Sequence, residues 1–229
     1  MVRFDIKIYT DTICPWCYIG HKSLDKAIGL YKKTYPGGSR DDFVFTFSPY
    51  YLDPTAPKVA IPWEQRVVQK NGDHMLHGIR TRLERVGREN GIQFNFESKI
   101  GSTRDSHRLL QHARQTKGPE AQKQLLEEIF EWHFEQGGDI TSHEGLTRAA
   151  TTIGLPEDEI SAFLLSDAYA TEVDALASQA RQKGVYSVPT IEINGKKINV
   201  EGAGDVSEFF EALINARPTV EPHDRSQPN

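Results

Sequence analysis

The chain has 229 residues and a mass of 25.9 kDa, the size of one large domain or of a domain with a sizeable insertion. Its 27 Lys and Arg residues against 32 Asp and Glu residues give a net charge of −5. Nucleic-acid-binding domains are typically basic, so we expect no nucleic acid as partner. No apolar run approaches the roughly 18 residues that cross a bilayer, so we expect no membrane partner either.

Only two cysteines occur, three positions apart. A secreted disulfide scaffold would hold more cysteines, spread along the chain. The first eleven residues, MVRFDIKIYTD, also lack the apolar core of a secretion signal. We therefore expect a cytoplasmic protein in a reducing compartment, with the cysteine pair kept for chemistry.

The N-terminal part has an α/β pattern. Apolar and polar residues alternate over residues 3–9, which is typical of a strand with one buried face. A helix is predicted over 15–35, with a proline at its first position and Pro-Gly-Gly after its end. Residues 43–47 predict a second strand, with three phenylalanines on one face.

The middle of the chain is predicted to be helical. A proline-punctuated loop covers residues 50–62. Thr103 and Ser142 stand where they can cap helices. The predicted helices, most of them separated by Gly or Pro, cover 63–70, 72–90, 103–116, 119–136, 143–153 and 157–165.

The α/β pattern then returns. A helix over 168–183 precedes a strand over 188–193, and Asn-Gly at 194–195 predicts a hairpin turn into a strand over 196–200. Asp205 is predicted to cap the last helix. Residues 217–229 hold three prolines and no apolar pattern, which predicts a disordered tail.

The sequence Cys14-Pro15-Trp16-Cys17 follows the first strand and opens the helix, the context of a thioredoxin-like redox site. Unpaired N–H groups at a helix start favour thiolate, and such cysteines have pKa values of roughly 3.5–7.5 instead of about 8.5. We expect Cys14 to be the accessible nucleophile. Cys17, one turn inside the helix, is expected to be buried and to resolve a mixed disulfide. Pro15 and Trp16 are predicted to contact the substrate.

A second part of the site is predicted at Val188-Pro189-Thr190, where a proline opens a strand. We predict a cis Val188–Pro189 bond that faces the thiols, although only about 5–6% of X–Pro bonds are cis. Pro189 would shape the docking edge. The Val188 backbone would pair with an extended substrate, and Thr190 would contact it as well.

Several segments, in order along most of the chain, resemble the DsbA-like thioredoxin proteins and specifically their FrnE-type cytoplasmic branch. They are Asp11-x-x-Cys14-Pro15-Trp16-Cys17-Tyr18-Ile19-Gly20, Phe47-x-Pro49-Tyr50-x-Leu52-x-Pro54, Ser106-His107-Arg108-Leu109-Leu110, Glu135-x-Gly137-x-Asp139-Ile140 and Val188-Pro189-Thr190. Kappa-class glutathione transferases and 2-hydroxychromene-2-carboxylate isomerases share the architecture. They resemble the chain less, because they have serine where Cys14 stands.

The resemblance implies an α/β fold, a thioredoxin fold with a large all-helical insertion domain. The thioredoxin-like domain would be discontinuous, residues 1–58 and 170–216, with the helical domain over 59–169. It also implies thiol–disulfide oxidoreductase or isomerase activity on a thiol- or disulfide-containing protein, or on glutathione. No metal or organic cofactor is required, and glutathione is a candidate redox partner or co-substrate.

Alternatives for individual residues stay open. A zinc site would need further ligands such as His107 and His112, and the helix-start position favours redox chemistry over it. Trp16 either presents an apolar face to substrate, which its helical phase favours, or packs the helix start. Asp11 is either a proton relay for Cys17 or, the favoured reading, a turn residue bonded to its own backbone. His107 borders the cleft in one reading and is simply packed in the other.

Alternatives for the whole site also remain. Gly204 and Asp205, at a helix start, would bind the γ-glutamyl end of glutathione, or Asp205 simply caps the helix. The first rival function is a glutathione-dependent isomerase or transferase acting on a small aromatic substrate. The second is a non-enzymatic partner protein whose cysteines sense redox state. Arginines at 80, 82, 85 and 88 predict a solvated helix face with internal ion pairs.

Overall fold

The computed structural model describes residues 1–198 and 203–218. Within these residues the main sheet has the order β2-β1-β5-β6. Strand β1 (Arg3–Thr10) pairs in parallel with β2 (Asp42–Pro49) and antiparallel with β5 (Thr190–Ile193). Strand β6 (Lys196–Lys197) closes the hairpin with β5. The sheet therefore joins strands from the two ends of the chain, as the predicted discontinuous domain requires.

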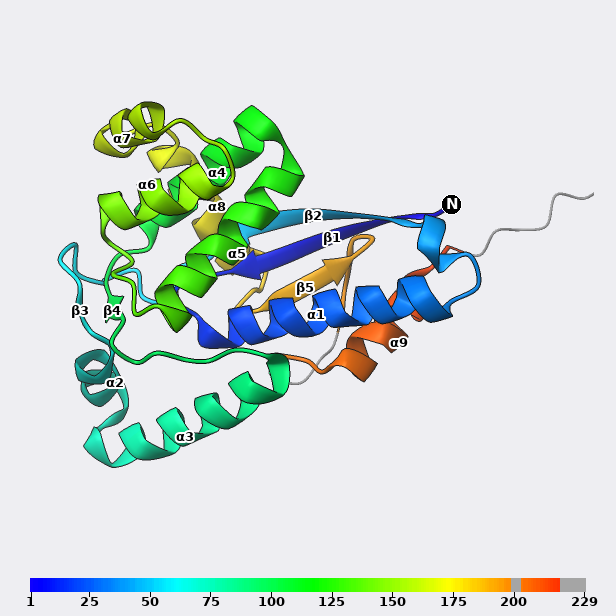
Figure 1. Cartoon of the computed structure of the whole chain (residues 1–229), viewed down its shortest axis with the longest axis horizontal. Coiled ribbons are helices and arrows are strands. Elements are labelled where there is room, and N and C mark those ends of the chain that lie inside the picture. Colours follow the sequence, from blue (N-terminus) through cyan, green and yellow to red (C-terminus); the bar gives the residue numbers. More distant parts are fainter. Residues whose placement is uncertain (199–202, 219–229) are drawn as a thin grey trace, which may run out of the picture.

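The helices α1 (Pro15–Thr34) and α9 (Val206–Ala216) pack together along one side of this sheet (Figure 1). Helix α5 (Pro119–Glu135) and helix α8 (Ala170–Gln182) both pack against β2. Because β2 is an edge strand of the described sheet, these two helices also cover that edge. Helix α1 begins where β1 ends, so the cysteines lie at the carboxyl end of β1.

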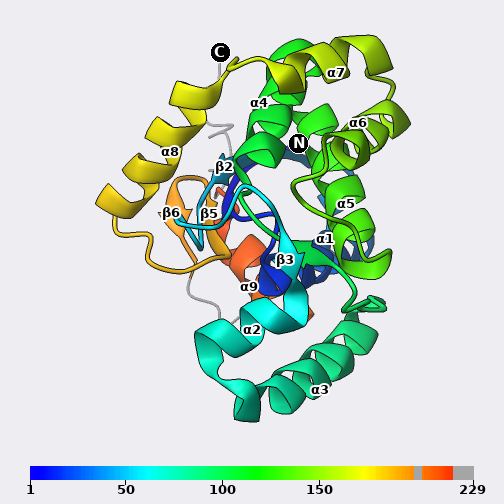
Figure 2. The ribbon, with the colours of Figure 1, turned by 90° about the vertical axis from the view of Figure 1, so that its left-hand side faces the viewer.

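The remaining helices form two groups, which lie at opposite ends of the view in Figure 2. One group is α2 (Trp63–Asn71) and α3 (Asp73–Asn90). The other is α4 (Arg104–Lys117), α6 (His143–Thr152) and α7 (Glu157–Leu165). The predicted helices are all confirmed to within two residues at their ends. A small antiparallel pair, β3 (Ile61–Pro62) and β4 (Lys99–Ile100), was not predicted and ties the start of α2 to the segment before α4.

The predicted caps have different outcomes. Ser142 accepts a hydrogen bond from the Gly145 N–H, and Asp205 forms a capping box with Glu208, so both predictions are confirmed. Thr103 stands at the start of α4, but its side chain caps nothing. Ser106 instead donates from its hydroxyl to the Thr103 carbonyl, 2.8 Å away.

The buried apolar side chains of the sheet and of the central helices belong to one continuous core cluster. Phe4 of β1, Leu24 of α1, Leu125 of α5 and Phe209 of α9 are fully buried members. The boundaries between the two predicted domains therefore stay a prediction. None of the described helices is long and apolar enough to cross a bilayer.

The chain end differs from the prediction at its first residue. Arg217 contacts Asp41 and the Tyr31 hydroxyl, so it is anchored to the helix–sheet layer. The predicted disordered tail otherwise falls on 219–229, outside the described residues. The end of the predicted strand over 196–200 lies outside them too.

Candidate active site around Cys14 and Cys17

The turn between β1 and α1 places Cys14 at the N-cap of the helix. The Cys14 N–H donates to the Asp11 carbonyl at 3.0 Å, which closes the turn. Cys14 has extended backbone angles, and its Sγ accepts a hydrogen bond from the Cys17 N–H at 3.3 Å. Pro15 at the first helical position has no N–H to leave unpaired. A sulfur in this position receives both an N–H donor and the positive end of the helix dipole.

Both cysteines are free thiols, and both are buried. Cys17 is 2% exposed, and burial, followed by its hydrogen bond with Cys14 and the charge of Cys14, raises the pKa of Cys17 well above its ordinary value. Cys14 is only 3% exposed, so the prediction of an accessible Cys14 is wrong for this conformation. The cause is a cover of apolar side chains from α2 and α3, described below.

The Val188–Pro189 bond is cis, as predicted. The Cys14 thiol lies 3.7 Å from the Val188 carbonyl oxygen, to which it donates, so this loop faces Cys14. Gly20 allows α1 to pack closely against Pro189 and Ala203, because a Cβ at this position would lie 3.1 Å from Pro189 Cγ and 2.8 Å from the Ala203 oxygen. Thr190 is buried, and its hydroxyl donates to the Ser187 carbonyl at 2.7 Å.

A cavity of about 370 Å³ opens above Cys14. It brings together four of the predicted site residues: Cys14, Pro15, Trp16 and Val188. It is not lined by the other predicted contacts, Pro189 and Thr190, nor by Gly204 and Asp205. Cys14 therefore lies at the floor of a pocket and not on an open surface.

The walls of this cavity come from residues that the sequence did not single out. Trp63 and Val67 of α2 and Leu83 of α3 are buried apolar members of the lining. Arg66 reaches the rim and is paired with Asp53. The helical spacing of the apolar residues in α2 and α3 could be recognised in the sequence. That spacing does not determine which part of the protein the apolar face of each helix contacts.

Trp16 is half-buried and not freely exposed. The Arg82 guanidinium lies over its indole ring, 4.7 Å from the centroid, a cation–π arrangement. Trp16 and Arg82 line the cavity above Cys14 and also a larger groove of about 890 Å³ on the other side of the indole. Two other arginines of α3 make the expected ion pairs within the helix, Arg80 with Glu84 and Arg85 with Glu89.

Gly204 and Asp205 line that larger groove beside Trp16. The Asp205 carboxylate accepts from the Glu208 N–H at 2.9 Å and from the Ser207 hydroxyl at 2.7 Å. Gly204 has φ +73°, and a Cβ there would lie 2.6 Å from the Phe209 ring. Both residues thus have a structural role at the start of α9. Because they also line a groove beside Trp16, the hypothesis that they bind glutathione stays a prediction.

A buried carboxylate and imidazole lie behind the motif. Asp11 is fully buried, and its Oδ2 accepts from the Leu52 N–H at 2.7 Å. His107 of α4 is 3% exposed, with Nε2 3.4 Å from Asp11 Oδ1. Asp11 thus bonds to a distant backbone amide instead of its own turn, so the favoured reading of its side chain is wrong. His107 is packed behind the loop and does not line the cavity.

The described residues contain one group of three potential metal ligands, and it lies away from the cysteines. His21, Asp25 and Glu127 come within metal-binding distance of one another. The Lys123 ammonium contacts both carboxylates, at 3.2 Å from Asp25 and 2.7 Å from Glu127. This ammonium supplies the positive charge that the two carboxylates attract, so the group is explained without a metal ion.

Glu127 gives this cluster a pH dependence. Burial alone would raise its pKa, but hydrogen bonds and positive charge from His21 and Lys123 lower the pKa to about 2. A carboxylate with a depressed folded-state pKa stabilises the fold above its unfolded value of about 4.5, and that contribution is lost as pH falls towards 2.

We therefore expect Glu127→Gln to destabilise the protein most at pH 6, with the difference from the wild type shrinking steadily below pH 4.5. Urea unfolding at a series of pH values measures this difference. Glu120→Gln, on the same helix and exposed, is the matched control. A difference that is constant from pH 6 to pH 3 would contradict the assignment.

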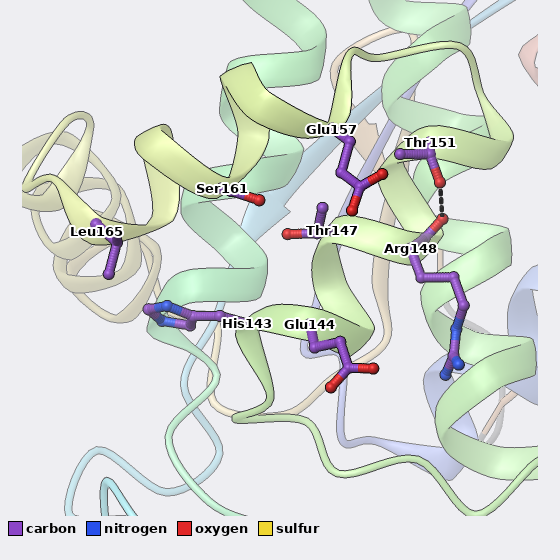
Figure 3. Close-up of a pocket in the computed structure, with 8 residues that line it drawn as sticks. All are labelled: His143, Glu144, Thr147, Arg148, Thr151, Glu157, Ser161 and Leu165. Carbon is purple, nitrogen blue, oxygen red and sulfur yellow. Dashed lines mark hydrogen bonds between the residues drawn. The ribbon is translucent and has the colours of Figure 1, made fainter.

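A further cavity, of about 460 Å³, lies between α6 and α7 (Figure 3). Apart from Leu165, its lining residues have polar side chains, among them His143, Glu144 and Glu157. The His143 ring lies 2.9 Å from Asp105, outside the lining. The cavity shares no lining residue with the one above Cys14, so the two are separate.

Comparisons with known proteins agree with this geometry. The model of the DSBA-like thioredoxin domain matches residues 5–214. A probable DsbA oxidoreductase from Streptomyces coelicolor is 26% identical, with a TM-score of 0.79 over 97% of this chain and 94% of that chain. No curated protein sequence matches the chain at a significant level.

Two more distant structures share the fold. The cytosolic disulfide reductase DsbM from Pseudomonas aeruginosa is 16% identical, with a TM-score of 0.61 over 92% of this chain and 97% of that chain, and it has also been solved with GSH. A 2-hydroxychromene-2-carboxylate isomerase is 14% identical, with a TM-score of 0.65 over 92% and 93%. Because the family model covers nearly the whole chain, the predicted resemblance and the thioredoxin fold are confirmed: this chain belongs to the DSBA-like thioredoxin domain family.

Proposed function

We propose that this protein is a thiol–disulfide oxidoreductase that uses Cys14 and Cys17 as its redox pair. The observation that carries the proposal is Cys14 at the N-cap of α1, with its sulfur accepting the Cys17 N–H and facing the cis Val188–Pro189 loop. An N–H donor and a helix N-terminus both stabilise a sulfur anion, which is the nucleophile in disulfide exchange.

The exchange has two steps. The Cys14 thiolate attacks one sulfur of a substrate disulfide, forms a mixed disulfide and releases the other substrate sulfur as a thiolate, which takes up a proton. Cys17 then loses its proton, attacks Cys14 and releases the second substrate thiol. The substrate gains two electrons and two protons, and the enzyme becomes the Cys14–Cys17 disulfide. The same steps in reverse oxidise a dithiol.

Burial of Cys17 suits the second step. The high pKa of Cys17 keeps it protonated while Cys14 reacts, so Cys14 alone acts as the first nucleophile. The chemistry requires no metal or organic cofactor. Glutathione is the proposed redox partner in the cytoplasm, and a thiol- or disulfide-containing protein is the proposed substrate.

A second candidate function is a glutathione-dependent isomerase or transferase that acts on a small aromatic substrate. The observation in its favour is the groove beside Trp16 that reaches Gly204 and Asp205 at the start of α9. The 2-hydroxychromene-2-carboxylate isomerase shares the fold. A thiol at position 14, able to form a disulfide with Cys17, favours the oxidoreductase.

One preparation tests both functions. Insulin reduction with glutathione as reductant and conjugation of 1-chloro-2,4-dinitrobenzene to glutathione are measured side by side. We expect insulin reduction, and a Cys14–Cys17 disulfide that forms in an oxidising glutathione buffer and is quantified by thiol trapping. Conjugation without any disulfide exchange would establish the second candidate instead.

A further inference from the structure

The depth of Cys14 limits what can reach it, and this inference rests on the proposed function. Its sulfur lies at the floor of a cavity of about 370 Å³, and its exposed fraction is 3%. A disulfide within the flat surface of a folded protein cannot approach such a sulfur without movement of α2 and α3. A disulfide in a protruding chain segment, or in a short peptide, can enter the cavity.

The cavity is built to hold an apolar group beside the reacting sulfur. Trp63, Ile79 and Leu83 lie on α2 and α3, and Ile100 closes the lining from β4. Most of the other lining residues are apolar as well, among them Ile13, Leu52 and Val188. An aromatic or large aliphatic side chain next to the substrate cysteine would lose its contact with water there, which favours binding.

The charges at the rim are positive, although the whole chain has a net charge of −5. Arg66, Lys70 and Arg82 line the cavity against one carboxylate, Asp53. Arg66 is already paired with Asp53, and the Arg82 guanidinium lies over Trp16. Lys70 is exposed on the last turn of α2 and makes no ion pair within the part of the chain that the structure describes. A positive rim attracts a negative partner.

We propose that the cavity above Cys14 selects disulfides in extended peptide segments in which the cysteine is followed by an apolar residue and then by an acidic one. The apolar side chain contacts Ile79 and its neighbours on α2 and α3, and the carboxylate pairs with Lys70. Lys70 and Ile79 are specificity residues and take no part in the electron transfer.

The test uses blocked heptapeptides that each form a symmetrical disulfide through one cysteine. Three peptides are compared, which differ only in the two residues after the cysteine: Phe-Glu, Phe-Lys or Gly-Glu. The measured quantity is the second-order rate constant at which each disulfide oxidises the pre-reduced protein, followed by trapping of the Cys14 and Cys17 thiols that remain. Oxidised glutathione, which is anionic but has no apolar side chain, is the small-molecule substrate for comparison.

We expect Phe-Glu to exceed Phe-Lys by about fivefold, the upper range for one exposed ion pair. We expect Phe-Glu to exceed Gly-Glu, and also oxidised glutathione, by at least about tenfold, because a buried phenylalanine contributes the larger part. Lys70→Glu should invert the Phe-Glu preference over Phe-Lys. Ile79→Ala should reduce the preference for phenylalanine over glycine.

Lys33→Glu is the matched control for Lys70→Glu, because Lys33 is exposed on α1, lies outside the cavity and changes the net charge equally. Equal rates for all three peptides, or preferences that Lys70→Glu leaves unchanged, would overturn the selectivity while leaving the proposed function in place. Faster reduction of oxidised glutathione than of every peptide would assign the cavity to that small molecule and overturn the peptide proposal. Absence of exchange with any disulfide would refute the proposed function, and the selectivity with it.

Discussion

Cys14→Ser is expected to lower disulfide exchange to the rate of the buffer alone. A serine hydroxyl at the N-cap still accepts the Cys17 N–H, so α1 keeps its capping hydrogen bond. The hydroxyl is, however, not ionised at neutral pH and forms no disulfide, so neither step of the exchange can occur. The loss should therefore appear in full in insulin reduction, with a fall in the free energy of unfolding of only about 1 kcal/mol, the typical cost of one substitution.

Cys17→Ser should behave differently, because it leaves the first step intact. Cys14 then forms a mixed disulfide that nothing resolves from within the protein. Non-reducing gels and intact-mass spectrometry should show the protein joined to its substrate, and the adduct should disappear on addition of dithiothreitol. The double variant should show no adduct. Full activity of Cys14→Ser, or a mixed disulfide formed through Cys17 in Cys14→Ser, would rule out Cys14 as the nucleophile.

The local elements could be predicted from the sequence because local physics sets them. Alternation over 3–9 gave β1, and Pro15 with Pro36-Gly37-Gly38 bounded α1 closely. The Asn194-Gly195 turn also has the positive φ angles that this dipeptide favours. Thr103 shows the limit of such rules: a good capping residue at the right position makes no cap, and its backbone angles, φ −91° and ψ 6°, are not the extended ones that a capping residue usually has.

The contents of the site could be predicted only in part. Cys14, Cys17 and the cis Pro189 follow from a short motif and one turn, so the sequence contains them explicitly. The cover over Cys14 depends on how α2 and α3 dock, which an apolar spacing does not specify. His107 shows the same limit, because 96 residues separate it from Asp11 and only the fold brings the two together. The selectivity that we propose rests on this unpredicted cover.

The burial of Cys14 shows that its reactivity and its accessibility have different structural causes, although both were expected from the same sequence motif. Reactivity is set locally, by the N-cap position and the Cys17 N–H. Access is set by side chains from α2 and α3. Variation in those helices can change the substrate without changing the redox pair, and this is a physical reason why proteins with a similar fold and different substrates can share the start of α1.

Asp11 is the residue behind the motif whose loss should cost most stability. Asp11→Leu is expected to destabilise the protein by roughly 1–3 kcal/mol, because it leaves the Leu52 N–H without its acceptor, which lies 2.7 Å away in the wild type. Asp11→Asn keeps an oxygen acceptor for the Leu52 N–H and should lose less. Urea unfolding measures both variants.

The control is Asp5→Leu, because Asp5 lies on β1, the strand that leads to Asp11, and its side chain is 66% exposed. Its change should stay within about 0.5 kcal/mol. If Asp11→Leu is no worse than this control, then the carboxylate does not hold the loop before Cys14. Leu52 lines the cavity above Cys14, and its N–H donates to Asp11. If Asp11→Leu is destabilised as expected and its insulin reduction falls as well, then this one hydrogen bond contributes both to the stability of the protein and to the shape of the cavity through which substrate reaches Cys14.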